Sequence, residues 1–156
     1  MMADRLAIIA SKGTLDMAYP PLILASTAAA MGMEAGIFFT FYGLNIVNKK
    51  KYHKLQVAPI ANPAMPMPVP NIIGTLPGMT AMATKMMKGM MGKANLPSIP
   101  ELVSICAETE VKMWPCQMTM DVMSIAPEDL IDEADNTCGA GAFLDYAADA
   151  SMSLFI

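Results

Sequence analysis

The sequence has little charge, few aromatic residues and a single histidine. Charged residues make up 15% of the 156 positions and aromatic residues 6%, and the formal net charge is −4. These values exclude a basic face for nucleic acid and a row of aromatic side chains for stacking bases. His53, the one histidine, lies in the basic run KKKYHKL, where a solvated helix end is expected. We therefore predict no catalytic triad, no zinc or other metal site and no cofactor.

Long apolar runs are also missing. No charge-free run approaches the ~20 residues that a membrane-spanning helix needs, and the apolar stretch of residues 6–10 is shorter than the roughly 7–15 residues of a signal-peptide core. The three cysteines form an odd set, which argues against a disulfide scaffold. We predict no integral membrane segment and a cytoplasmic location, where thiols stay reduced.

What the sequence does have is apolar content, at 54% of all residues. One domain covering residues 1–156 is long enough to bury a real core. So high an apolar fraction indicates either a sheet buried on both faces or a surface that other subunits cover.

Short apolar runs alternate with helical segments along the chain. The expected strands are 4–10, 33–41, 111–115 and 152–156, and the expected helices are 15–32, 42–52, 98–110, 117–125 and 138–151. This alternation predicts an α/β fold, with a small doubly wound, mainly parallel sheet and helices on both faces. Ligands of such sheets bind beyond the carboxyl ends of the strands.

A Pro/Met-rich insertion interrupts this alternation at about residues 59–95. Residues 59–78 are dense in proline and are expected to be extended or looped. Residues 79–91 are expected to form an amphipathic helix, on which Met79, Met82, Met86 and Met90 lie in one stripe. Packing is favoured over Cu(I) binding by the thioethers. The stripe is expected to face another subunit or to cover the mouth of Cys116.

Cys116 is the principal candidate for chemistry. It follows Pro115 at the junction between an expected strand and an expected helix, in the run VKMWPCQMTMDVM. The N–H groups at a helix N-terminus favour a thiolate or a terminal persulfide. A buried structural cysteine is the alternative, and position alone leaves both interpretations open.

The other two cysteines have weaker claims. Cys106 lies ten residues before Cys116 on the preceding helix, where it would resolve a disulfide, relay sulfur or simply pack against the sheet. Cys138 precedes GAGA and is interpreted as a structural residue at the start of the last helix.

Three segments carry a resemblance to a known family. FFTFYGL at 38–44, CQMTMDVM at 116–123 and CGAGAFLDYAADASMSLFI at 138–156 resemble the DsrE/DsrF/DsrH-like proteins, in the branch with a Met-rich insertion that is labelled sulfurtransferase-like or peroxiredoxin-like. The resemblance implies a doubly wound fold and a homo-oligomer. It also implies a cysteine that carries sulfane sulfur as a persulfide or thiosulfonate and passes it to a TusA-like carrier. Cys116 matches that position, and Cys106 matches a second cysteine of the branch.

The leading hypothesis is therefore a cytoplasmic sulfur-trafficking protein that carries sulfur on Cys116, taken from a small anion such as thiosulfate, and hands it to a partner thiol. It is expected to act as a carrier or sulfurtransferase. One alternative is a thiol redox protein in which Cys106 and Cys116 form a reversible disulfide. The other is a non-catalytic oligomeric module whose Met-rich segment is the working surface.

Overall fold

The computed structural model describes residues 4–67, 69–134 and 136–156. Four strands form one sheet in which every pairing is parallel, in the order β3-β2-β1-β4. The strands are β1 (Arg5–Ala10), β2 (Glu34–Phe39), β3 (Lys112–Pro115) and β4 (Met152–Phe155). The chain runs outward from β1 to β3 and then crosses to β4 on the other side of β1. The predicted doubly wound α/β fold is confirmed.

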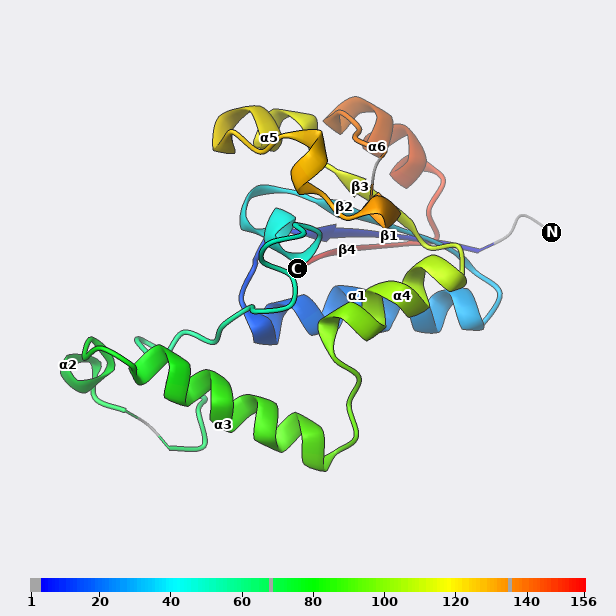
Figure 1. The fold of residues 1–156 in the computed structure, drawn as a ribbon. Coiled ribbons are helices and arrows are strands. Elements are labelled where there is room, and N and C mark those ends of the chain that lie inside the picture. Colours follow the sequence, from blue (N-terminus) through cyan, green and yellow to red (C-terminus); the bar gives the residue numbers. More distant parts are fainter. Residues whose placement is uncertain (1–3, 68, 135) are drawn as a thin grey trace.

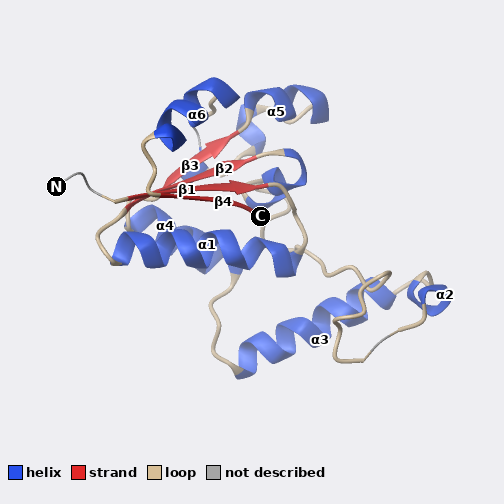
Figure 2. Cartoon of the chain, turned by 180° about the vertical axis from the view of Figure 1, so that it is seen from behind, coloured by secondary structure: helices blue, strands red, loops and turns tan. Residues whose placement is uncertain are grey.

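Helices cover both faces of this sheet (Figure 1). The α-helices are α1 (Leu15–Ala30), α2 (Asn71–Gly74), α3 (Met79–Lys93), α4 (Ile99–Glu108), α5 (Gln117–Met123) and α6 (Ala140–Ala148). Short 3-10 turns are η1 (Phe41–Ile46), η2 (Pro127–Asp129) and η3 (Asp132–Ala134). In Figures 1 and 2, α1 and α4 lie on one face, and α5 and α6 lie on the other. In the described part of the chain, no helix is both long and apolar enough to cross a membrane.

Each face of the sheet has its own apolar cluster. The larger cluster joins β1 and β2 to α1 and α4, through fully buried side chains such as Ile8, Leu22 and Ile37. The smaller cluster lies under α6, where Phe38 and Phe143 stack with ring centroids 4.8 Å apart. Burial on both faces explains the apolar composition, because the inner strands β1 and β2 need hydrophobic residues on both sides.

Local sequence features fix several helix ends. Ser98 and Glu101 form a complete capping box at the start of α4, with the Ser98 N–H donating to the Glu101 carboxylate at 2.7 Å. Gly32 follows α1 with φ at 84°, the left-handed conformation that glycine adopts freely. Pro20 and Pro21 lie inside α1, which begins at Leu15. Pro21 is buried in the core, and packing of this helix face against the sheet offsets the missing N–H donors.

The expected helix at 42–52 is wrong. The chain forms η1 and then turns, and Asn48 pairs with Leu130 in a one-residue antiparallel bridge. Gly43 explains the tight path, because a Cβ at that position would lie 2.0 Å from the carbonyl oxygen of Ala10. The close approach of η1 to the end of β1 therefore overrides the helical preference of the lysine-rich stretch.

The expected helix over 79–91 is confirmed as α3, and the proline-rich segment before it is largely loop with the single turn α2. Figure 1 shows α3 displaced from the sheet, beyond the face that α1 covers. Met79 and Met86 pack around a small apolar hollow against Met65 and Met67 of the insertion itself. Half of the methionine stripe is thus covered by its own segment.

Two glycine substitutions should change stability in opposite directions. Gly43→Ala should lower the free energy of unfolding by about 1–3 kcal/mol, since the methyl group collides with the Ala10 carbonyl. Gly89→Ala, in the middle of α3, should raise it by about 0.5–1 kcal/mol, because a methyl there meets no described atom within 4 Å. Urea unfolding followed by circular dichroism measures both. A neutral Gly43→Ala would contradict the close approach of η1 to β1.

Candidate functional site

Cys116 lies where the sequence predicted, at the carboxyl end of β3 and directly before α5. It is the N-cap residue of α5, with extended backbone angles, and its N–H donates to the carbonyl of Phe39 at 2.9 Å. Pro115 pairs with Phe39 in the β2–β3 register, so the strand pairing leads straight into the cysteine. The Cys116 side chain is 6% exposed and joins the smaller apolar cluster with Phe38 and Phe143.

The start of α5 contributes less to the thiol than expected. Among the described residues, the Cys116 side chain makes no cap hydrogen bond to the helix. The first N–H of the helix, that of Gln117, donates to the carbonyl of Cys138 at 3.1 Å. The strongest influences on Cys116 are therefore the apolar cluster that buries it and the segment that crosses beside it.

Cys138 is the neighbour that sequence reasoning missed. Cys116 and Cys138 form a one-residue parallel bridge, in which the Cys138 N–H donates to the Pro115 carbonyl at 3.0 Å. Cys138 is half-buried and packs against the same apolar cluster. Burial raises the pKa of the Cys138 thiol, and a negative charge on Cys116 raises it further. The sequence feature that could have indicated this pairing is that Cys116 and Cys138 each lie at the start of an expected helix.

Cys106 belongs to a different environment. It is fully buried in α4, within the larger cluster on the α1 face, and its Sγ donates to the Leu22 carbonyl at 3.5 Å. Burial raises the pKa of the Cys106 thiol to about 12. Cys106 and Cys116 thus lie on opposite faces of the sheet. This placement corrects the expectation that they act as a pair, and it removes the basis for a Cys106–Cys116 disulfide.

Comparison with known proteins fits this architecture. A family model described as the DsrE/DsrF/DrsH-like family matches residues 2–155. The chain belongs to this family. It is 48% identical, over the full length of both chains, to a protein of Allochromatium vinosum named sulfur carrier protein DsrE2. It is 31% identical to the uncharacterized protein YrkE of Bacillus subtilis, with 97% of this chain and 96% of that protein covered.

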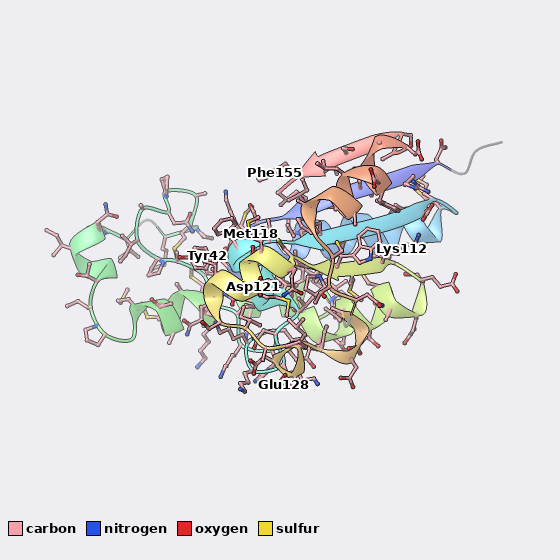
Figure 3. The ribbon with its side chains drawn as sticks, turned by 90° about the horizontal axis from the view of Figure 1, so that it is seen from above. Tyr42, Lys112, Met118, Asp121, Glu128 and Phe155 are labelled. Carbon is pink, nitrogen blue, oxygen red and sulfur yellow. The ribbon has the colours of Figure 1, made fainter. Side chains whose placement is uncertain are left out.

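In this DsrE-like chain, exposed apolar side chains lie on η1 and α5, the two elements that adjoin Cys116. Phe41 and Tyr42 of η1 are 58% and 65% exposed, and Met118 and Val122 of α5 are 71% and 72% exposed. The two elements are tied together, since the hydroxyls of Thr40 and Thr119 lie 3.1 Å apart. Figure 3 shows Tyr42 and Met118 at one end of the sheet and Lys112 toward the other. We call Phe41, Tyr42, Met118 and Val122 the apolar rim.

The remaining candidates lie elsewhere. His53 is exposed on a turn and packs edge-on against Tyr52, with ring centroids 5.7 Å apart, so the predicted helix end is a turn. The described residues contain no group of three His, Cys, Asp or Glu side chains arranged to hold a metal ion. The Met-rich helix α3 lies beyond the α1 face, whereas Cys116 heads α5 on the other face, so within one chain α3 is not a lid over Cys116 (Figures 1 and 2).

The three thiols should differ in reactivity toward iodoacetamide. At about pH 8, a thiol with a pKa of about 12 is ionised in roughly one molecule in ten thousand, so Cys106 should stay unmodified in the native protein. Cys138 should react faster than Cys106, because it is only half-buried and, although burial raises its pKa, its thiol is far more accessible. Peptide mapping after timed quenching gives the three rates. Protein unfolded in urea is the control, in which all three should react alike, and fast native labelling of Cys106 would contradict its buried environment.

Proposed function

We propose that this protein is a sulfur carrier in which Cys116 holds a sulfane sulfur as a persulfide or thiosulfonate and passes it to a partner thiol. The observation that carries the proposal is the full-length relative named a sulfur carrier protein. The choice of Cys116 is supported by its position at the carboxyl end of β3, where ligands of parallel sheets bind.

The loading step needs no external oxidant. The Cys116 thiolate attacks the sulfane sulfur of thiosulfate, a new S–S bond forms on Cys116, and sulfite leaves with the electron pair of the broken bond. With tetrathionate as the donor, the same attack gives a thiosulfonate on Cys116 and releases thiosulfate. The apolar surroundings of Cys116 support storage, because they restrict access of water and stray thiols to the reactive sulfur.

The acceptor is proposed to be a TusA-like sulfur carrier protein with a reactive thiol. A protein acceptor must approach Cys116 closely, and the apolar rim offers exposed hydrophobic contact beside it.

The free thiols of the chain fit a reducing compartment, so we place the protein in the cytoplasm.

Sulfur loading on Cys116 is directly measurable. After incubation with polysulfide or thiosulfate and removal of excess donor, the intact mass of the wild type should increase by one sulfur atom, and with tetrathionate by one thiosulfonate group. The adduct should vanish in Cys116→Ser, because that variant has no nucleophile at the end of β3, and should persist in Cys106→Ala, whose thiol lies on the other face. A wild type that gains no mass with any donor, or a Cys116→Ser variant that gains it fully, would reject the proposal.

We also propose that the protein is a homo-oligomer that associates through α2 and α3. The argument rests on exposed apolar side chains gathered there: Met82 is 56% exposed, Ile72 85% and Leu76 55%. Exposed patches of this kind on a single chain indicate a surface that another protein covers. The exposed basic residues Lys85 and Lys88 add charge to α3 outside the methionine stripe.

Substituting the exposed part of the stripe tests this association. Met82→Asp combined with Met90→Asp should lower the mass seen by light scattering, because each charge would have to be buried in the interface. Thr80→Asp is the matched control, since it adds a charge to the same helix outside the stripe. An unchanged oligomeric mass in the double variant would show that α3 is not the interface.

A further inference from the structure

We propose that Cys138 is a second sulfur-carrying residue, which takes the sulfane sulfur from Cys116 and presents it to the acceptor thiol. The inference rests on the proposed function, because it requires a Cys116 that has been loaded with sulfur. It gives a function to Cys138, whose thiol takes no part in the loading step.

The backbone holds the two cysteines side by side. The Cys138 N–H donates to the Pro115 carbonyl at 3.0 Å, and the Cys138 carbonyl accepts from the Gln117 N–H at 3.1 Å. These two bonds on either side of Cys116 make it the parallel partner of Cys138. Side chains of directly paired residues in a parallel ladder point to the same face of the sheet. Both thiols are accordingly packed in one apolar cluster.

The spacing of the pair is short enough for transfer of a sulfur atom. Paired residues on adjacent strands lie about 4.8 Å apart, and their parallel Cβ atoms keep roughly that separation. A disulfide prefers Cβ atoms about 3.5–4.5 Å apart, and both cysteines are free thiols in this structure. A persulfide extends the Cys116 side chain by one S–S bond of about 2.05 Å. That extension brings the outer sulfur within reach of Cys138 without moving the backbone.

The two positions differ in access. Cys116 is 6% exposed beneath Phe38 and Phe143, whereas Cys138 is half-buried in the loop just before α6. An acceptor thiol can therefore reach the half-buried Cys138 more readily than the buried Cys116. The buried Cys116 protects the stored sulfur, and the half-buried Cys138 delivers it to the acceptor.

The transfer step balances without any added reagent. The Cys138 thiolate attacks the outer sulfur of the Cys116 persulfide, an S–S bond forms on Cys138, and the original S–S bond breaks to leave a Cys116 thiolate. Sulfane sulfur and charge are conserved, and no thiol is oxidised overall. The acceptor thiolate then attacks the same outer sulfur on Cys138. Attack on the inner sulfur would instead expel hydrosulfide and leave a Cys116–Cys138 disulfide.

Time-resolved mapping of the sulfur distinguishes these routes. Wild-type protein is loaded with polysulfide, freed of excess donor, and quenched with an alkylating reagent at set times before and after glutathione is added as the acceptor probe. Cleavage at Glu128 and Glu133 separates the peptides that contain Cys116 and Cys138. We expect the persulfide on Cys116 first and on Cys138 later. In Cys138→Ser and Cys138→Ala the persulfide should remain on Cys116, and release to glutathione should slow by about tenfold or more.

The outcomes separate this inference from the sulfur-carrier proposal. A wild type that never gains sulfur overturns both. Loading on Cys116 with unchanged release in both Cys138 variants overturns the role of Cys138 alone, and so does a Cys116–Cys138 disulfide formed with release of hydrosulfide. Loading of Cys138 in Cys116→Ser, followed by transfer to Cys116 in the wild type, would reverse the proposed order.

Cys106→Ala, which removes a buried thiol on the other face, controls for loss of a cysteine, and near-UV circular dichroism checks the fold of each variant.

Discussion

The backbone pairing of Cys116 with Cys138 is the constraint on which the thiol site depends. Cys138 is brought back to the end of β3 by a connection of irregular chain and two 3-10 turns between α5 and α6. That connection is fixed on its way, because the Ile131 N–H donates to the Val47 carbonyl at 2.9 Å and the Lys49 N–H donates to the Asp129 carbonyl at 2.8 Å. The segment after η1 therefore serves as a support for the return of Cys138. The close contact of Gly43 with Ala10 anchors that support on the sheet.

The sheet separates the three thiols into two different environments. All three cysteines are free, yet the four strands separate Cys106 on the α1 and α4 face from Cys116 and Cys138 on the α6 face. Full burial among aliphatic side chains keeps Cys106 protonated, because its ionised form would lose hydration without gaining a counter-charge. The thiols of Cys116 and Cys138 lie at the carboxyl end of β3, beside exposed residues. Position relative to the sheet thus separates the thiol buried in the larger cluster from the two thiols that pack in the smaller one.

The fold could be predicted from the sequence because its signals are local. Short apolar runs mark the strands, and the capping box at Ser98 and Glu101 marks α4. The place of Cys116 followed from the same reasoning, since Pro115 ends a strand and a helical pattern begins at Gln117. These signals are read within a few residues, and tertiary contacts did not override them.

The partner of Cys116 could not be predicted in the same way. Cys106 is close in sequence, but the crossover from α4 into β3 puts it on the face opposite to α5. Cys138 is distant in sequence, and the long return between α5 and α6, supported by pairing of Asn48 with Leu130, brings it to the site. The error over residues 42–52 has the same origin, because contacts of that segment with the end of β1 and with the 124–139 connection determine its path.

The two surfaces of the chain that stand out lie on different sides of the sheet. The insertion with α3 lies beyond the α1 face, and the cysteine pair with the apolar rim lies at the carboxyl edge near α5 and α6 (Figures 1 and 2). A contact between subunits through α3 would leave that edge open to an acceptor protein. The methionine stripe and the cysteine pair are therefore spatially separate features of the chain. Helix α3 and the segment before it lie outside the layered core, and within one chain they leave uncovered the carboxyl end of β3, where Cys116 and Cys138 pair.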